Sequence, residues 1–446
     1  MAIGTALGIL ALAGAALAVT IYTISAIASS GTQSTIITGT LVASWGQGAE
    51  LQRGRYVYSF FQAANANNQT MTARGITQSG TTLTNSASST IIFNGTADFD
   101  PYSRGQAASI VRLNDTQVAM IAPIVGTGNE FKICTYNGGT NNITIDFSVN
   151  DGDTNNYIDR GPKFSVINKP SANVYTIAGV GVTKPNAYPY VRVWDLDTDA
   201  ETITSRGILY PMGTSGTGNG FSQLVNLGVV GGKHCFAIFY AKGVTATGPL
   251  YYAVYEYNSS TNTLVEVVGD TLYRSGSAYI TADIPWEIDN GRGVLMYSDW
   301  VNYDVEITTC IWDGTTFTVG TPSSFGNATK RGFHMTIRKY YDGQGDSKTQ
   351  YIMVTGFFNS GVNTADVIVF PIFYDFDTNT WDVSKFDTAD SEIVIEDPGT
   401  PSNNGRALKP YIGLADKDNG AVISIIFRGD GTFRGVIQNN FTTTNT

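Results

Sequence analysis

The sequence predicts an all-β fold, closed on itself and preceded by one long hydrophobic helix. Charged residues make up only 14% of the 446 residues, whereas Gly, Thr, Ser, Asn and Tyr are abundant, as in chains of many short strands joined by tight polar turns. After residue 30, runs of β-branched and aromatic residues alternate with Gly, Asn, Asp and Thr turns, and no segment holds a helical period. Closed β folds often exceed the usual domain length, so one large domain is expected.

The hydrophobic start covers residues 1–30. Residues 3–28 hold no charged side chain, and the first charged residue of the chain is Glu50, so this segment is long enough to cross a bilayer as a helix. It lacks the basic region of a secretory signal and exceeds the usual length of its apolar core. We therefore expect a retained helix; the alternative is cleavage after the Ala-Ile-Ala triplet at residues 26–28.

Small residues recur along this segment at a spacing that suits helix pairing. Gly4 and Gly8 form a full GxxxG motif, and further small residues follow at the same interval. This spacing lets two helices approach closely in lipid. We expect a homo-oligomer formed through the N-terminal helix.

One turn phrase recurs along the rest of the chain: an aromatic residue, Asp or Asn, two further residues and Thr. Copies begin at Tyr136, Trp194, Tyr257 and Tyr374, and Trp312 begins a shorter copy. We expect each copy to form a hairpin in which the aromatic residue ends a buried strand and the Asp or Asn side chain caps the turn.

Further strands precede each copy in a fixed order, so the repeating unit is four antiparallel strands over about 50 to 60 residues, the signature of a β-propeller blade. We predict a seven-bladed propeller over residues 31–446. An early strand at residues 34–44 would complete the last blade and remove the exposed sheet edges. The blades are expected near residues 51–95, 106–147, 162–205, 220–268, 279–320, 332–395 and 405–440.

The copy "YDFDTNTWDV" at Tyr374 resembles the Y-D-x-x-T-x-x-W turn of kelch-repeat propellers, and the other copies are weaker versions. The systematic Gly-Gly pair of kelch blades is missing, because the pairs at residues 138–139 and 231–232 are out of phase with each other. The resemblance is therefore to seven-bladed propellers in general and covers about residues 51–440. It implies a fold and no activity, since propellers host both enzymes and binding surfaces.

The reactive side chains do not form a recognisable catalytic set. The two histidines, His234 and His334, stand beside apolar strands, and no G-x-S-x-G nucleophile motif is present. Cys134, Cys235 and Cys310 lie far apart in sequence beside apolar residues, so we expect small buried hydrophobes; one disulfide among them stays open as the alternative. Paired carboxylates for glycoside cleavage could be assembled in space from the many aspartates, a pairing that sequence does not show.

Two further patterns concern metals and modification. Asp195, Asp197, Asp199 and Glu201 alternate along "DLDTDAE", and alternating carboxylates can wrap Ca²⁺. The Gly and distant Glu of a full calcium loop are missing and Asp suits the turn itself, so we expect turn residues and no cofactor. Seven N-x-S/T sequons are glycosylation candidates if the source modifies its surface proteins: Asn68, Asn94, Asn114, Asn142, Asn258, Asn327 and Asn440.

The loops between the second and third strands of the predicted blades share one face of a propeller. Their aromatic residues Tyr188, Tyr190, Trp300 and Tyr303 would suit stacking on sugar rings or anchoring a protein partner. The alternative is local packing against neighbouring blades.

These patterns predict a non-enzymatic structural or attachment protein, a virion spike or cell-surface adhesin. It would be held in a membrane or an assembly core through residues 3–28 and would bind a protein or glycan receptor with the propeller face. A net charge of -10 without a Lys/Arg cluster excludes nucleic acid. Two alternatives stay open: a filament subunit, because the start is similar to archaeal pilins and archaellins, and an anchored or secreted glycan-active propeller enzyme.

Overall fold

A computed structural model describes the protein, and among the described residues there are strands and turns but no helix. The all-β prediction is therefore confirmed for this part of the chain, in which no helix is long and apolar enough to cross a membrane. The described backbone covers residues 22–27, 33–38, 43–52, 54–65, 68–79, 82–93, 109–124, 127–154, 158–183, 188–211, 222–242, 248–280, 287–299, 304–326, 331–339, 348–359, 364–384, 386, 393–396, 411–416, 421–427, 432–438 and 441–445.

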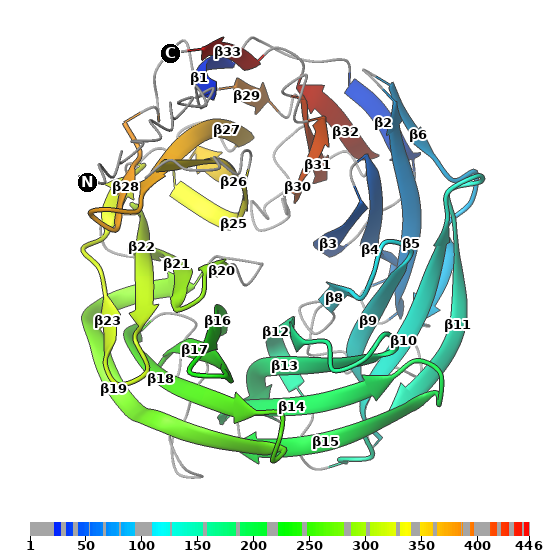
Figure 1. Ribbon diagram of the computed structural model, residues 1–446. Coiled ribbons are helices and arrows are strands. Elements are labelled where there is room, and N and C mark those ends of the chain that lie inside the picture. The colour runs from blue at the N-terminus through cyan, green and yellow to red at the C-terminus, as the bar shows by residue number, and fades with distance from the viewer. Residues whose placement is uncertain are drawn as a thin grey trace, which may run out of the picture.

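The strands form antiparallel sheets that stand side by side around a central axis (Figure 1). The strands β3, β8, β12, β16, β25 and β30 lie nearest the axis, and the strands at the other end of each sheet lie toward the rim. The sheets are numbered here in chain order of their inner strands. Sheet 1 contains β3 (Ala43–Gln52), β4 (Arg55–Asn65), β5 (Asn68–Ser79), β6 (Thr82–Asn85) and β7 (Thr90–Phe93). Sheet 2 contains β8 (Ser109–Arg112), β9 (Gln117–Ile124), β10 (Gly128–Asn137) and β11 (Asn142–Asn150). Sheet 3 contains β12 (Ile158–Asn168), β13 (Val174–Thr183), β14 (Pro189–Asp197) and β15 (Thr202–Leu209).

Sheet 4 has nine strands because one long strand joins two groups. The 18-residue strand β19 pairs with β18 at the rim of the first group, and its last residues, Ala278–Ile280, pair with β21 of the second group. We call these groups half 4a and half 4b. Half 4a contains β16 (Ser222–Val230), β17 (Lys233–Ala241), β18 (Gly248–Asn258) and β19 (Thr263–Ile280); half 4b contains β20 (Glu287–Asp289), β21 (Arg292–Asp299), β22 (Val305–Trp312), β23 (Phe317–Val319) and β24 (Ser323–Phe325).

The two ends of the chain meet in the remaining sheets. In sheet 6 the early strand β2 pairs antiparallel with β32, and a separate two-stranded sheet joins β1 to β33. Sheet 5 contains β25 (Arg331–Lys339), β26 (Lys348–Asn359), β27 (Thr364–Asp375), β28 (Thr380–Asp382) and β29 (Ile393–Glu396); sheet 6 contains β30 (Tyr411–Asp416), β31 (Ala421–Phe427), β32 (Thr432–Gln438) and β2 (Gln33–Thr38); the terminal sheet contains β1 (Tyr22–Ile27) and β33 (Phe441–Asn445).

The N-terminal segment differs from its prediction. A continuous helix over residues 3–28 is wrong at its end, because Tyr22–Ile27 is a strand that pairs with β33. The run is rich in β-branched and aromatic residues, which fit a pleated sheet better than a helix. Residues 1–21, with the predicted helix-pairing motif, lie outside the described residues. The segment predicted to close the ring, residues 34–44, is divided between β2 and the start of β3.

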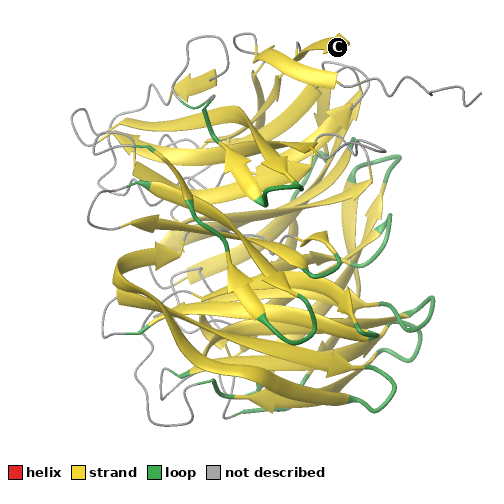
Figure 2. Ribbon diagram, turned by 60° about the vertical axis from the view of Figure 1, so that its left-hand side comes forward, coloured by secondary structure: helices red, strands yellow, loops and turns green. Residues whose placement is uncertain are grey.

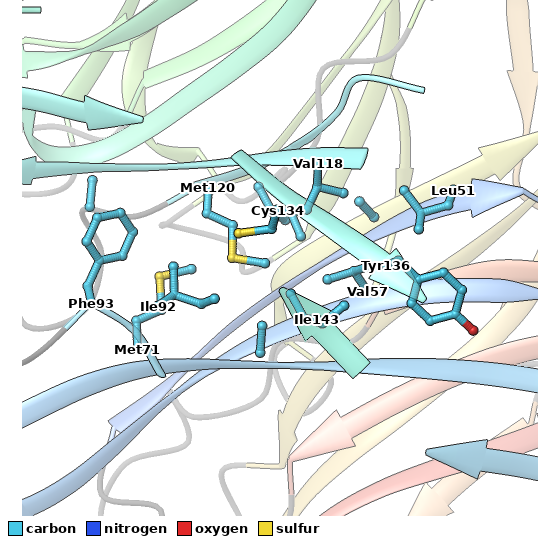
Figure 3. Packing of buried hydrophobic residues seen from close by; sticks show 14 of the residues in the cluster. Leu51, Val57, Met71, Ile92, Phe93, Val118, Met120, Cys134, Tyr136 and Ile143 are labelled. Atoms are coloured by element: carbon cyan, nitrogen blue, oxygen red, sulfur yellow. The ribbon is translucent and has the colours of Figure 1, made fainter. Parts of the chain in front are cut away.

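Among the described residues, sheets 2 and 3 and halves 4a and 4b bury both of their faces against their neighbours. On β9, Val118, Met120 and Ala122 pack against sheet 1, whereas the alternate residues Ala119 and Ile121 pack against sheet 3. This is the two-residue period of a strand, with apolar residues at both phases because both sides are covered. Figure 3 shows one such cluster, in which side chains of sheets 1 and 2 interdigitate.

The structure explains the recurring turn phrase. In the copy at Tyr257, the Asn258 side-chain oxygen accepts a hydrogen bond from the Ser260 amide at 3.0 Å. The turn then ends at Asn262 in the left-handed region with φ of 54°, a conformation that Asn tolerates better than most residues. The tyrosine hydroxyl donates to that asparagine side chain in three copies: Tyr136 to Asn141 at 2.5 Å, Tyr257 to Asn262 at 3.0 Å and Tyr374 to Asn379 at 2.8 Å.

The copy at Trp194 is shifted by two residues. Asp197, not Asp195, caps the turn by accepting hydrogen bonds from the amides of Asp199 and Ala200 at 3.0 and 2.9 Å. Glu201 then takes the left-handed position with φ of 52°. All of these turns join the third and fourth strands of a sheet, and Figure 2 shows many of the described turns projecting on one side of the molecule.

Replacing Asn262 by Ala should lower the free energy of unfolding by about 1 to 2 kcal/mol, because Ala is strained in the left-handed region and the Tyr257 hydroxyl loses its partner. Asn262→Gly is the matched control, since it loses the same hydrogen bond without the strain. Urea denaturation of the two variants measures the difference. Equal losses would show that backbone conformation contributes nothing at this position.

The three cysteine thiols are buried and free, as the sequence predicts. Burial raises the pKa of the Cys134 thiol to about 12 and that of Cys235 to about 11, and it raises the pKa of Cys310 well above its usual value. The thiolate is the reactive form. The native protein should therefore resist iodoacetamide at pH 8 and take up three equivalents only in denaturant, as counted by mass spectrometry. Rapid labelling of the folded protein would contradict the burial.

Candidate functional site

The end of the sheets opposite the turn phrase carries the loops between second and third strands and the passages from one sheet to the next. We call this end the loop face. Three clusters of charged and tyrosine side chains lie there, each at a boundary between neighbouring sheets or halves. The boundaries are those between sheets 2 and 3, between sheet 3 and half 4a, and between halves 4a and 4b.

The first cluster joins halves 4a and 4b through Arg274. This residue lies on β19, where it pairs with Leu250 of β18, four residues before the part of β19 that pairs with β21. Its Nη1 atom donates to both carboxylate oxygens of Glu306 at 2.7 and 2.8 Å, and its Nη2 atom donates to Asp299 at 2.5 Å. Asp299 ends β21 and Glu306 lies near the start of β22. One guanidinium therefore holds two carboxylates of the neighbouring half.

Two tyrosines complete this arrangement. The Tyr297 hydroxyl donates to Glu306, and the hydroxyls of Tyr273 and Tyr297 lie 3.3 Å apart. Burial, together with Tyr273 and the charge of Glu306, raises the pKa of Tyr297. The Tyr297 hydroxyl thus stays protonated and keeps Glu306 in place as a hydrogen-bond donor.

Asp304 is the third carboxyl group of the first cluster. The Asp299 amide donates to the Asp304 carbonyl at 2.8 Å, which closes the short loop over residues 300–303. Burial and then the charges of Asp299 and Glu306 raise the pKa of Asp304. A carboxyl group whose pKa is raised beside carboxylates held by an arginine is the division of roles used in acid and base catalysis.

The sequence pointed to this loop through Trp300 and Tyr303 but missed its acidic residues. The signal was present, because "SDWVNYD" has an aspartate on each side of the loop and Glu306 follows two residues later. What sequence could not show is Arg274, which arrives from another part of the chain. Trp300 and Tyr303 themselves lie outside the described residues.

The second cluster lies between sheets 2 and 3. Arg192 Nη1 contacts Asp153 at 2.9 Å and Asp151 at 3.2 Å. Asp151 also accepts hydrogen bonds from the Asn129 side chain at 2.8 Å and from the Trp194 indole at 3.2 Å. Both aspartates follow the outer strand β11 where the chain passes to sheet 3. This ion pair is almost fully buried on the Arg192 and Asp151 side, with exposed side-chain fractions of 6% and 1%.

The third cluster lies between sheet 3 and half 4a. The Tyr240 hydroxyl donates to Asp270 at 2.5 Å, and Lys242 forms an ion pair with the same carboxylate. The Lys242 ammonium also lies 3.7 Å from the centre of the Tyr251 ring, a cation–π contact. Burial, followed by the bond to Asp270, raises the pKa of Tyr240.

Two of the predicted stacking residues, Tyr188 and Tyr190, lie in the described part of the chain, at the start of β14 near Arg192 of the second cluster. Tyr188 is half-buried, whereas Tyr190 has no exposed surface. The prediction that Tyr190 is an exposed anchor is therefore wrong; its ring packs at the boundary of sheets 2 and 3, 6.5 Å from the ring of Tyr210. The Tyr190 side chain lies on the side of β14 that faces sheet 2, so local packing, the alternative given by the sequence, describes its role.

The four weak calcium candidates do not converge. Asp195 accepts hydrogen bonds from Arg206 at 2.6 Å and from Thr176 at 2.7 Å, and Asp197 caps a turn. Asp199 accepts from Asn173, and Glu201 is exposed. Among the described residues no group of three or more His, Cys, Asp or Glu side chains is placed to hold a metal.

The glycosylation candidates and histidines differ in exposure. Asn142 is exposed, but the Asn114 amide donates to Gln117 at 2.8 Å and to the Tyr175 hydroxyl at 3.1 Å, which occupies its nitrogen. Asn258 caps its turn. His234 is half-buried, and burial lowers its pKa. The side chains of the remaining candidates lie outside the described residues: Asn68, Asn94, Asn327, Asn440 and His334.

The comparisons with known proteins give weak likenesses. No family model and no curated protein matches the chain. Among solved structures it is similar to an oligogalacturonate lyase in complex with manganese, at 10% identity and a TM-score of 0.42, covering 93% of this chain and 99% of that one. It is also similar to the NanB sialidase from Streptococcus pneumoniae, at 12% identity and 0.46 over 92% and 71%. An exo-β-1,3-galactanase from Phanerochaete chrysosporium matches at 10% and 0.34 over 78% and 97%.

The prediction of a non-enzymatic attachment protein is contradicted. The structures named above are enzymes with propeller-type folds, and none is an adhesin or a spike. Their similarity to this chain is too low to carry over any of their activities. What the protein does must be argued from its own side chains.

Asp304→Asn should raise the melting temperature at pH 7. The folded-state pKa of Asp304 lies above its usual value, so the folded protein binds this proton more tightly than the unfolded chain. Stability is therefore lost as pH rises from the usual carboxyl range through the raised pKa, and Asn avoids that loss. Below pH about 3.5 the two proteins should melt alike, because the carboxyl is protonated in both states. Thermal melts between pH 3 and 8 measure this.

Asp313→Asn supplies a control of opposite sign. Hydrogen bonds from the Thr316 amide and from Thr315 lower the pKa of Asp313, so its contribution to stability is present at neutral pH and lost as pH falls. The substitution should lower the melting temperature at pH 7 and have little effect in acid. A stabilising effect of both variants, or of neither, would contradict the assigned environments.

Proposed function

We propose that the protein is a seven-bladed β-propeller enzyme that cleaves glycans at the Arg274 cluster of the loop face. The blade count follows if halves 4a and 4b are two blades and sheets 1, 2, 3, 5 and 6 are one blade each. Each half has its own strands from axis to rim, and the passage of β19 is the strand pairing that joins them among the described residues.

The observation that carries this proposal is Asp304 beside Asp299 and Glu306. Glycosidases use two carboxyl groups, one that keeps its proton and donates it to the departing oxygen and one that acts as base or nucleophile. The raised pKa of Asp304 suits the acid. Asp299 is held by Arg274, and the backbone bond from Asp299 to Asp304 places both residues at the base of one loop.

The loop between these aspartates supports a sugar as the ligand. It contains Trp300 and Tyr303, and aromatic rings suit stacking on the apolar faces of sugar rings. In this proposal, Asp304 protonates the glycosidic oxygen and Asp299 activates water or attacks the sugar carbon. Glu306 is bound by Arg274 and Tyr297 and holds the guanidinium in position.

The proposal also includes how the propeller is attached to its surroundings. We propose that residues 3–21 attach the propeller to a membrane or an assembly, which would place the loop face outside the cell. Self-association through the same segment follows from its small-residue spacing.

Incubating the purified protein with a panel of oligosaccharides and polysaccharides, with products separated by chromatography, tests the proposal. Asp304→Asn should lower kcat by about 10² to 10⁴, the usual contribution of a general acid. Asp313→Asn is the matched control, because it changes an aspartate of the turn face and should leave kcat unchanged. Binding of glycans without any cleavage, or full activity of Asp304→Asn, would overturn the proposed reaction.

A further inference from the structure

The basic side chains of the three loop-face clusters are already engaged by carboxylates. Arg274 uses both of its terminal nitrogens on Glu306 and Asp299. These are charge-assisted hydrogen bonds to two separate carboxylates. A sugar carboxylate approaching this guanidinium would find both terminal nitrogens engaged and two negative charges beside it.

The other two clusters repeat this arrangement. Arg192 lies between Asp151 and Asp153, and Lys242 pairs with Asp270 while covering the Tyr251 ring. In each cluster the positive charge is matched or exceeded by acidic side chains. The chain as a whole carries a net charge of -10, so the long-range field also repels anions.

The tyrosine hydroxyls of the first and third clusters also favour an uncharged partner. Burial raises the pKa of Tyr297 and that of Tyr240, so both hydroxyls are neutral. A neutral hydroxyl group can donate to a carboxylate and exchange hydrogen bonds with a tyrosine hydroxyl, whereas a carboxylate can only accept.

We propose that the loop face selects uncharged glycans and rejects acidic ones, an inference that rests on the proposed glycan-cleaving function. Selection would arise from repulsion as well as from attraction: a uronic or sialic acid carboxylate meets engaged cations and fixed negative charge, whereas a neutral hydroxyl meets carboxylate acceptors and tyrosine hydroxyls. Specificity of this kind works by penalising the wrong ligand.

Matched glycan pairs that differ in charge test this selection. Homogalacturonan in its methyl-esterified and de-esterified forms, and lactose with sialyllactose, keep the sugar backbone and change the charge. We expect the wild-type protein to bind or cleave the neutral member at least about tenfold better at low salt. Added salt should narrow the difference, because the screening length falls to about 10 Å at 0.1 M.

Asp153→Asn is the informative variant, since it removes one negative charge of the second cluster and leaves the Arg274 cluster intact. It should reduce the preference for neutral glycans about threefold, the effect of one nearby charge in a solvent-like medium. Melting temperature serves as the control for folding. If this variant unfolds, the salt dependence of the wild-type protein decides the question by itself.

The outcomes separate the two proposals. Equal or better action on the acidic member of the pairs would overturn the charge selection and leave the proposed function standing. Absence of both binding and cleavage for every glycan would overturn the proposed function and this inference with it. A neutral preference that salt does not change would also overturn the inference, because it would come from shape and not from charge.

Discussion

Burial of both faces of sheets 2 and 3 and of halves 4a and 4b is the constraint on which the rest of the described structure depends. In half 4a, Ala237 and Phe239 of β17 pack toward half 4b, while the alternate residues Phe236 and Ile238 pack toward sheet 3. Strands with apolar residues at both phases have no solvent face of their own. Each sheet therefore needs a neighbour on both sides, and a ring provides two neighbours for every sheet.

Because of this constraint, polar and charged side chains gather at the two ends of the sheets. The two ends then differ in what these side chains do. At one end, a tyrosine and asparagine pair in three of the turns and a capping aspartate in two others satisfy hydrogen bonds within the turn and leave little to offer a ligand. At the other end, sheet boundaries bring together charges from separate parts of the chain. A buried ion pair costs desolvation that only well-placed partners offset, and Arg274 meets this requirement by holding Asp299 and Glu306 together.

Sequence was sufficient where the physics is local. The all-β class, the hairpin at each turn phrase and the burial of the cysteines follow from two-residue periods and turn chemistry within a few residues. Sequence-based prediction failed for residues whose contacts come from distant parts of the chain. Arg274 meets Glu306 only because β19 crosses between two halves, and Tyr190 turns inward because of a neighbouring sheet. Residues 22–27 show a different limit, since an uncharged run does not by itself distinguish a helix from a strand paired with the other end of the chain.

The Arg274 cluster also links the candidate chemistry to the ring itself. Its guanidinium belongs to half 4a and its carboxylates to half 4b, so the position of the guanidinium relative to Asp299 and Glu306 is set by how the two halves pack. The raised pKa of Asp304 is an energetic cost that a protein selected only for stability would avoid. The surrounding interface tolerates that cost because Tyr297 is fixed by burial and Arg274 by its hydrogen bonds to Asp299 and Glu306. A site placed in a single loop would relax to remove it, whereas a site shared between two packed sheets cannot do so without separating them.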